Sequence, residues 1–142
     1  MKFTPLNNQP NISNRGFESV SPSMQLDSRG FPHISWLDKK QGHNTINYRF
    51  WDGLQWSKLE DSIIDRSEEE IIHSHNGIVL ENESPIVAYS KRDVIGSLLT
   101  IAYPSEGDWV KSSLSVSYDT KWIGIVPVIE GLEFSSSSLF LV

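Results

Sequence analysis

Hydrophobic and polar residues alternate along much of this chain in short runs that turn-forming residues separate. The clearest run covers residues 45–51, where Ile46, Tyr48 and Phe50 take every second position and predict the buried face of a strand. Asp52-Gly53 follows, and this dipeptide is typical of tight hairpin turns. The same alternation predicts neighbouring strands at residues 24–26, 33–37 and 56–59. The first part of the chain is therefore predicted to form four antiparallel strands.

The same pattern returns 53 positions later without a gap. Trp36 falls opposite Tyr89, and Trp56 falls opposite Trp109. The other matched positions are Leu26 with Val79, Ile46 with Leu99, Tyr48 with Ile101 and Phe50 with Tyr103. The repeat predicts the strands of a second unit at residues 78–80, 86–90, 98–103 and 109–112. Repeats of this length are typical of stacked units, each of which needs a neighbour to cover its apolar face.

A weaker third copy lies 92 positions after the first and covers residues 119–142. Its matched residues are Val126 with Ile34, Val128 with Trp36, Phe140 with Tyr48 and Val142 with Phe50. A fourth strand for this unit is expected from residues 15–20, which resemble the hairpin and strand at residues 52–59. The N-terminal part of the chain is thus expected to complete the last unit.

These units divide the chain into an arm and a repeat region. Residues 1–14 are rich in Asn and Pro and predict an extended arm. Residues 15–142 are expected to hold three units, at about residues 21–60, 71–114 and 115–142, the last with a strand from 15–20. The acidic residues 60–70 are expected to form a solvated loop rather than a helical turn capped by Ser67 and Glu70. The expected fold class is therefore all-β.

The first unit resembles the repeats of bacterial and phage β-propellers, which read roughly D-x-x-G-x-P-H-I-x-Y and then L-x-Y-x-x-W-D-G-x-x-W. The corresponding stretches here are residues 27–36 and 46–56. This resemblance implies that each unit is a four-stranded propeller blade. The Asp-x-x-Gly turn differs from the Asp-box of sialidases, because it lies between the first two strands and no Trp follows at the position that an Asp-box requires.

Residues 51–56 are also similar to small fucose-binding propeller lectins, whose chains carry a few blades and complete six-bladed rings by oligomerising. The sugar-binding residues of that family do not carry over. Ser35 or Trp36 stands where its Arg would be, and Asn47 or Arg49 stands near the place of its Glu. Propellers usually have four to eight blades, so three units do not close a ring. We therefore expect a homodimer with six blades, or else other proteins at the open edges.

The composition narrows the classes of function. A net charge of −6 and scattered Lys and Arg residues argue against binding to nucleic acid. The absence of cysteine excludes disulfides and thiol chemistry. No apolar stretch approaches the length of a membrane span, and the first residues lack the apolar core of a signal peptide. We expect a soluble protein without membrane contact, and both a virion-associated and an extracellular setting fit the sequence.

The repeat also separates structural residues from candidate binding residues, because a residue kept in both copies serves the unit itself. Trp51 has no such counterpart, since Pro104 takes its position. It lies beside Arg49 on the strand face opposite Ile46, where an indole ring and a guanidinium could hold a sugar. The predicted ligand-binding residues are Arg49, Trp51, Asp52 and Trp122. The alternative for Trp51 is burial between adjacent blades.

We expect no metal site, no cofactor and no catalysis. His73 and His75 share a strand face, but no third ligand accompanies them. Four aspartates offer oxygen ligands for calcium, yet each is placed where a turn favours Asp: Asp27, Asp38, Asp52 and Asp119. The glutamates with no glycosidase motif are Glu18, Glu60, Glu81 and Glu130. The sequence also contains neither a nucleophile elbow nor a phosphate-binding glycine loop.

Several functions remain open at this point. The favoured one is a lectin-like carbohydrate-binding propeller assembled from several chains, because five Trp, four Tyr and six Phe residues make the chain rich in aromatic side chains. The alternative is a structural or assembly protein, such as a virion decoration or tail component, which the open edges and the arm favour. A remnant of a glycoside-hydrolase propeller is a weaker third interpretation. The expected partner is accordingly a carbohydrate or another protein.

Overall fold

The computed structural model describes residues 11–13, 16, 18–68, 72–92, 97–116, 132–135 and 138–141. Sheet 1 consists of β1 (Glu18–Leu26), β2 (Pro32–Lys40), β3 (His43–Phe50) and β4 (Ile63–Glu68). Sheet 2 consists of β5 (Ile72–Glu81), β6 (Ser84–Arg92), β7 (Ser97–Ser105) and β8 (Asp108–Val116). The remaining elements are a 3₁₀ turn (Glu60–Ser62), β9 (Leu132–Ser135) and β10 (Ser138–Leu141). The expectation of an all-β fold is confirmed.

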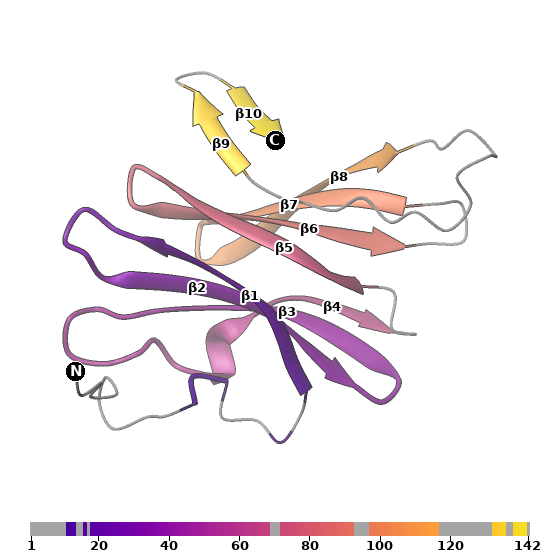
Figure 1. Ribbon diagram of the computed structural model, residues 1–142, viewed down its shortest axis with the longest axis horizontal. Helices are drawn as coiled ribbons and strands as arrows, with labels where there is room; N and C mark the ends of the chain where they lie inside the picture. Colours follow the sequence, from indigo (N-terminus) through magenta and orange to yellow (C-terminus); the bar gives the residue numbers. More distant parts are fainter. Residues whose placement is uncertain are drawn as a thin grey trace.

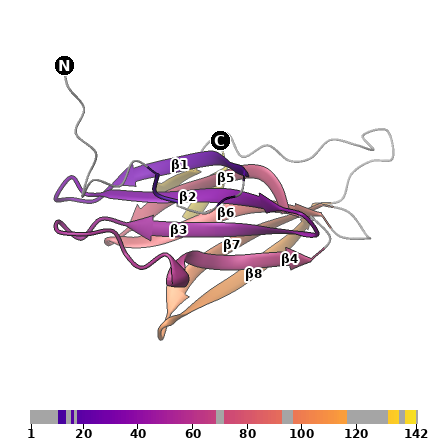
Figure 2. The same ribbon diagram turned by 90° about the horizontal axis from the view of Figure 1, so that it is seen from below.

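Each four-stranded sheet is an antiparallel meander in which the strands follow chain order. Figure 1 shows β1 and β5, the first strands of the two sheets, side by side. Figure 2 shows the strands of both sheets in the same order, with β1 and β5 at one edge and β4 and β8 at the other. The two sheets are therefore stacked with their equivalent strands next to each other.

Side chains from both sheets form one apolar core between them. Sheet 1 contributes Leu37, Ile46 and Ile64, and sheet 2 contributes Ile78 and Val87, together with Tyr89 and Ala102. Complete burial of such a side chain stabilises a fold by about 1.5–3 kcal/mol. The alternating positions Ile46 and Tyr48 face this core, as the sequence predicts, because a strand turns every second side chain to the same side.

The strand register reproduces the sequence repeat. Ile34 pairs with Arg49 between β2 and β3, and Val87 pairs with Ala102 between β6 and β7, which is the same pairing 53 residues later. The first strands depart from this offset, since Leu26 pairs with Pro32 whereas Leu80 pairs with Pro85. Leu80 rather than Val79 is thus the counterpart of Leu26. The β1–β2 connection is one residue longer than its copy, and this insertion shifts the match.

The fourth strand of sheet 1 lies later than the sequence predicts. Trp51 and Trp56 form an isolated bridge, which confirms the Asp-Gly hairpin and matches the pair Pro104–Trp109 in sheet 2. After that bridge the chain leaves the sheet, and β4 resumes the pairing at residues 63–68. The prediction of a strand at 56–59 and a loop at 60–70 was wrong. The reason is that β4 buries polar as well as apolar side chains, including Asp65 and Ser67.

The segment expected to complete a third unit belongs to sheet 1 instead. Glu18, Ser19 and Val20 begin β1 and pair with residues 37–39 of β2. Val20 packs against the core, which explains why this segment stays with sheet 1. The strands β9 and β10 lie within the stretch assigned to the third unit, and β9 lies next to β5. The remainder of that stretch lies outside the described residues.

Candidate functional site

A cleft of about 990 Å³ opens between the two sheets, at the end where the β1–β2 and β5–β6 turns meet. The β1–β2 turn comprises residues 27–31, and Asn82 and Glu83 form the β5–β6 turn. Side chains from β2, β3 and β8 continue the wall of the cleft below these turns. The cleft therefore exists only because the two repeat units are stacked.

Aromatic rings from both sheets line one side of the cleft. Tyr48 of β3 meets Trp109 of β8 edge to face, with ring centroids 5.5 Å apart. His33 of β2 stacks on Phe50 of β3 at 5.6 Å and 20°. The rings of Tyr48, Phe50 and Trp109 are only partly buried. A ligand in the cleft would consequently meet apolar ring surfaces that the packing of the sheets already holds in place.

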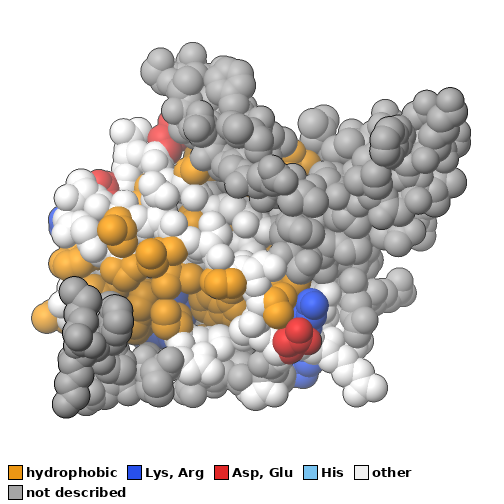
Figure 3. All heavy atoms as spheres, viewed as in Figure 1, with side chains coloured by type: hydrophobic (Ala, Val, Ile, Leu, Met, Phe, Trp, Pro, Cys, Tyr) orange, Lys and Arg blue, Asp and Glu red, His pale blue; other side chains and the backbone are white. Residues whose placement is uncertain are grey.

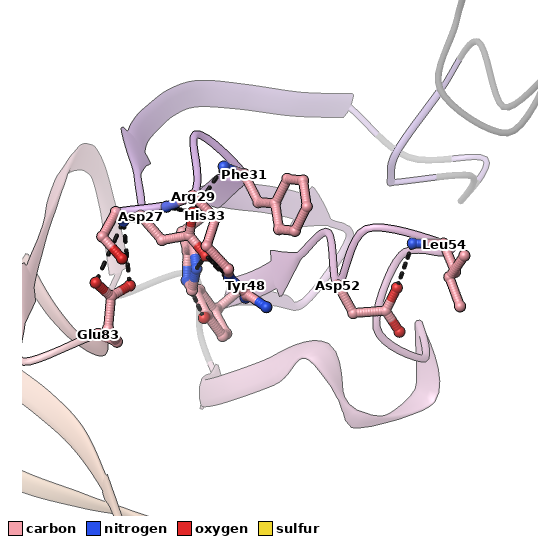
Figure 4. Close-up of polar contacts among 9 residues, drawn as sticks. Asp27, Arg29, Phe31, His33, Tyr48, Asp52, Leu54 and Glu83 are labelled. Atoms are coloured by element: carbon pink, nitrogen blue, oxygen red, sulfur yellow. Dashed lines mark hydrogen bonds and ion pairs between the residues drawn. The ribbon is translucent and has the colours of Figure 1, made fainter.

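The β1–β2 turn is fixed by the carboxylate of Asp27. Its Oδ1 atom accepts hydrogen bonds from the backbone amides of Arg29 (2.9 Å) and Phe31 (2.7 Å), as Figure 4 shows in part. Its Oδ2 atom accepts two more from the Arg29 guanidinium, at 3.0 and 2.9 Å. Burial acts to raise the pKa of Asp27, but these bonds from Phe31 and Arg29 outweigh it and lower the pKa. Asp27 is thus an ionised anchor that holds the Arg29 side chain at the cleft.

The β5–β6 turn contacts the β1–β2 turn through Glu83. The Glu83 carboxylate accepts the backbone N–H of Ser28, with oxygen distances of 3.2 and 3.3 Å (Figure 4). Asn82 and Glu83 have φ angles of 48° and 66°, as in a type I′ hairpin turn. Asn tolerates this conformation, whereas it is strained for Glu. The Glu83 contact therefore ties the two sheets together at the mouth of the cleft.

His33 and Tyr48 form a polar pair deeper in the cleft. The His33 Nδ1 atom lies 2.6 Å from the Tyr48 hydroxyl, and its Nε2 atom lies 4.0 Å from Oδ2 of Asp27. Burial lowers the pKa of His33, although the charges of Asp27 and Glu83 oppose the shift. Burial also raises the pKa of Tyr48. Near neutral pH both groups are therefore uncharged, and both can donate or accept hydrogen bonds with a ligand.

Two of the residues predicted to bind a ligand are buried on the other face of sheet 1. Arg49 donates hydrogen bonds to the carbonyl oxygens of Ser57 (2.7 Å) and Ile12 (2.6 Å). Trp51 is 8% exposed and packs edge to face against Trp56 at 5.8 Å. The ring face that a stacked sugar would need is thus covered in this chain. The alternative interpretation of Trp51 was burial between adjacent blades. Trp51 is indeed buried, on the face of sheet 1 that is turned away from sheet 2.

The other two predicted residues also lie away from the cleft or outside the described part. Asp52 is exposed, and its Oδ1 atom accepts the backbone N–H group of Leu54 at 2.7 Å (Figure 4). The same atom accepts the backbone N–H group of Gln55, also at 2.7 Å. These bonds lower the pKa of Asp52, and they are what an aspartate contributes to a tight turn. Arg49, Trp51 and Asp52 thus share the hairpin end of β3 without lining the cleft. Trp122 lies outside the described residues.

The residues that line the cleft were not among those predicted from the sequence to bind a ligand. Some of them nevertheless differ between the two copies of the repeat, which was the criterion for a binding residue. His33 falls opposite Ile86 and Tyr48 falls opposite Ile101, so each is unique to the first copy by the criterion that selected Trp51. Trp109 carries no such signal, because Trp56 matches it. In the structure the two matched tryptophans have different environments, since Trp56 is buried whereas Trp109 lines the cleft.

The aspartates considered for calcium serve other purposes where they are described. Asp27 and Asp52 stabilise turns, as predicted. Asp38 does not lie in a turn; it is buried within β2 and accepts the indole N–H of Trp36 at 2.8 Å. Across the described ranges, no three His, Cys, Asp or Glu side chains gather in a way that could hold a metal ion. Asp119 and the side chains of His73 and His75 are outside the described part.

Two comparisons with known proteins assign no family to this chain. No protein-family model matches it, and no curated protein matches it either. In the portion of the chain that the structure covers, no helix has the length and apolar character needed to cross a membrane. The function must consequently be argued from the cleft itself.

Proposed function

We propose that this chain is a non-catalytic binding module that holds a carbohydrate in the cleft between its two sheets. The observation that carries the proposal is the position of Trp109 and Tyr48, whose partly exposed rings come from opposite sheets, meet edge to face, and line the same cleft as the anchored Arg29. In this proposal the sheets are propeller blades, which the shared register of the two copies supports.

The chemistry of the cleft suits a sugar. Its aromatic rings can pack against the apolar C–H face of a pyranose, and its polar groups can bind the hydroxyls at the rim. Those polar groups are available at the mouth of the cleft: the Arg29 side chain is 62% exposed, and Glu83 is exposed as well. Lys58 and Asp61 also line the cleft and add one charge of each sign. A mostly apolar cleft with a few convergent polar groups is the usual form of a small-ligand site.

The protonation states of Asp27, His33 and Tyr48 support binding rather than catalysis. A glycosidase needs a carboxylic acid whose raised pKa keeps it protonated, opposite a second carboxylate. The pKa of Asp27 is shifted in the other direction, and its oxygens already accept four hydrogen bonds from Arg29 and Phe31. His33 is neutral and Tyr48 keeps its proton, so neither is an activated nucleophile or a charged acid.

A glycan array followed by a fluorescence titration tests this proposal. We expect the full chain to bind at least one glycan class, and we expect the tryptophan emission to change as that glycan is added. Trp109→Ala should abolish both effects, because it removes the ring that sheet 2 contributes to the cleft. Tyr103→Ala is the matched control, since this ring is exposed and does not line the cleft. An array with no bound glycan, together with unchanged emission, would refute the proposal.

A structural or assembly role is the second candidate, and one observation favours it. Met24 and Leu26 of β1 are more than half exposed, and clustered exposed apolar residues often mark a protein interface. The arm also contacts the face of sheet 1 that is turned away from sheet 2, where the carbonyl of Ile12 accepts a hydrogen bond from Arg49. If this role is correct, deletion of residues 1–14 should impair assembly with the partner. Unimpaired assembly after the deletion would count against it.

A further inference from the structure

We infer that the cleft binds an unbranched, uncharged oligosaccharide of the cellulose or chitin type, and that two adjacent sugar units lie on the rings of Tyr48 and Phe50. This inference rests on the proposed function and names the class of glycan for the same cleft. It is carried by the arrangement of the aromatic rings, by the size of the cleft and by the charges of the residues that line it.

Tyr48 and Phe50 form an apolar floor with two separate ring surfaces. They lie two residues apart on the same face of β3, which places them about 6.8 Å apart along the strand. Their ring centroids are 6.1 Å apart and their planes differ by 29°. Atoms of rings in full face-to-face contact approach to about 3.5–4.0 Å, so these two rings are displaced sideways from each other. Both are partly buried and line the cleft, so each offers its own surface to a ligand.

The buried side chain of His33 fixes both rings of this floor. His33 pairs with Phe50 in the register of β2 and β3, and its imidazole stacks on the Phe50 ring at 5.6 Å and 20°. Its Nδ1 atom lies 2.6 Å from the hydroxyl of Tyr48. The floor is therefore held in place by the fold itself, which reduces the conformational entropy that a ligand must overcome on binding.

Trp109 forms a wall beside the inner of the two rings. Tyr48 is the inner ring, because it lies on β3 between Phe50 and the fully buried Ile46. The indole ring stands at 73° to the Tyr48 ring, with centroids 5.5 Å apart. One sugar unit can thus lie on Tyr48 with its edge against Trp109, and the next unit of the chain can lie on Phe50.

The volume of the cleft supports more than one sugar unit. Clefts for drug-sized ligands measure about 300–1,000 Å³, and such ligands are larger than a single sugar ring. At about 990 Å³ this cleft lies at the upper end of that range. A single sugar on Tyr48 would leave the Phe50 part of the floor to water.

A continuous apolar floor favours sugars whose ring faces carry only C–H groups. In glucose and N-acetylglucosamine the ring substituents are equatorial, so both faces of each unit are apolar. Successive units of cellulose and chitin chains are turned over relative to each other, and either face can therefore lie on an aromatic ring. An axial hydroxyl, as in mannose or galactose, interrupts one of these faces and loses its hydrogen bonds to water when it is pressed against a ring.

The charged residues of the cleft suit an uncharged chain. Lys58, Asp61 and Glu83 are exposed and line the cleft. The charge of Arg29 is balanced by Asp27, which accepts hydrogen bonds from its Nε and Nη2 atoms. Groups of both signs can donate to and accept from sugar hydroxyls, whereas a chain of uronic acids would bring its carboxylates into a cleft lined by Asp61 and Glu83.

Affinities for sugars of increasing length test the inference. The probes are glucose, cellobiose and cellotetraose, and N-acetylglucosamine, chitobiose and chitotetraose, each titrated into the full chain and followed by tryptophan fluorescence. We expect one of the two tetrasaccharides to bind at least about tenfold more tightly than its monosaccharide. Most of this gain should come with the second unit, because that unit adds the contact with Phe50.

Phe50→Leu separates the two ring surfaces. The substitution keeps an apolar side chain but removes the flat ring, so it should weaken binding of the tetrasaccharide at least about fivefold. It should leave the affinity for the monosaccharide unchanged, and this retained binding shows that the variant is folded. The matched control is Tyr103→Leu, since Tyr103 occupies the same position in the second copy of the repeat but does not line the cleft. It should keep all wild-type affinities.

A second control concerns apolar surface outside the cleft. Figure 3 shows hydrophobic side chains gathered over the region of β1 and β2. Met24 of β1 is 58% exposed and pairs with Ile34, on the face of sheet 1 turned away from sheet 2. Met24→Ala should also keep the wild-type affinities, because this face does not border the cleft.

Three results would overturn the inference while the proposed function stands. They are equal affinities for monosaccharide and tetrasaccharide, a Phe50→Leu variant that binds the tetrasaccharide as tightly as the wild type, and a glycan array on which only glycans other than the cellulose and chitin types bind. An array with no bound glycan at all would refute the proposed function and the inference together.

Discussion

The hydroxyl of Tyr89 on β6 donates a 2.7 Å hydrogen bond to Oδ2 of Asp65 on β4, and this bond joins the two sheets inside the molecule. Lys91 and Lys111 of sheet 2 approach the same carboxylate at 3.1 and 3.3 Å. Asp65 is buried, so these three partners take the place of water around its charge. The position of sheet 2 relative to sheet 1, and with it the shape of the cleft, therefore depends on a polar contact as well as on the apolar core.

Removal of the Asp65 charge should destabilise the fold. In Asp65→Asn the two lysines lose their counter-charge, and we expect the free energy of unfolding to fall by about 1–3 kcal/mol. Urea unfolding followed by tryptophan fluorescence measures the difference. The matched control is Glu106→Gln in the exposed β7–β8 turn, which should change stability by about 0.5 kcal/mol or less. Equal stability of the two variants would show that Asp65 does not hold the sheets together.

The same residue predicts a loss of stability in acid. Burial acts to raise the pKa of Asp65, but the hydrogen bonds from Tyr89 and Lys91 and the charge of Lys111 lower it below the usual 3.8. The unfolded chain consequently binds the proton first as pH falls, and the stabilisation is lost from about pH 4 downwards. Urea midpoints measured between pH 6 and pH 3 should drop more steeply in the wild type than in Asp65→Asn. Parallel pH profiles would contradict this prediction.

His33 should titrate below its usual range. Burial lowers its pKa from 6.5, against the opposing charges of Asp27 and Glu83. Between the two pKa values the unfolded chain binds more protons than the folded one, so His33 makes the fold less stable as pH falls below about 6.5. NMR titration of the imidazole resonances measures the midpoint. Glu83→Gln should lower it further, because a charge that favours the imidazolium is removed; a midpoint above 6.5 in the wild type would be inconsistent with this account.

Replacement by alanine should destabilise the fold more at Gly53 than at Gly42, although both glycines lie in turns. Its φ angle is 104°, and a Cβ atom there would meet the Phe31 ring at 3.0 Å. Gly42 has a φ angle of 83° but would place a Cβ atom in open space. Both alanine variants should lose stability because Ala disfavours positive φ, and Gly53→Ala should lose more, since the ring must also move. Thermal unfolding of the two variants compares them, and a larger loss for Gly42→Ala would contradict the packing described for Phe31.

The sequence predicts the sheets well because strand alternation and the repeat report the same physical requirement. Ile46 and Tyr48 face the core since a strand exposes every second side chain to one side, and matched residues take equivalent positions in the register of β2–β3 and β6–β7. The β4 strand was not predicted because one of its buried residues, Asp65, is charged. Tyr89 and two lysines of the other sheet compensate this charge by hydrogen bonds and ion pairs. Such a partnership depends on tertiary packing and leaves no local pattern.

The site was harder to predict for a similar reason. The cleft is formed by residues far apart in sequence, such as Tyr48 and Trp109, and only the stacking of the sheets brings them together. The search for unmatched residues selected Trp51, which the structure buries against Trp56. The search did not select Trp109, because Trp56 matches it in the first copy. A matched residue can nevertheless have a different environment in each copy. Comparison between repeats therefore identifies the common framework more reliably than the residues that contact a ligand.

The most direct test of the carbohydrate cleft is a ¹H–¹⁵N NMR titration of the full chain with a glycan identified on the array. The Trp109 indole N–H resonance should shift as the glycan is added, because this ring lines the cleft. The Trp36 indole N–H, which donates to Asp38 within sheet 1, serves as an internal reference and should stay in place. Shifts at Trp109 that follow a single binding curve would support the account. An unchanged Trp109 signal at a glycan concentration that saturates binding would contradict it.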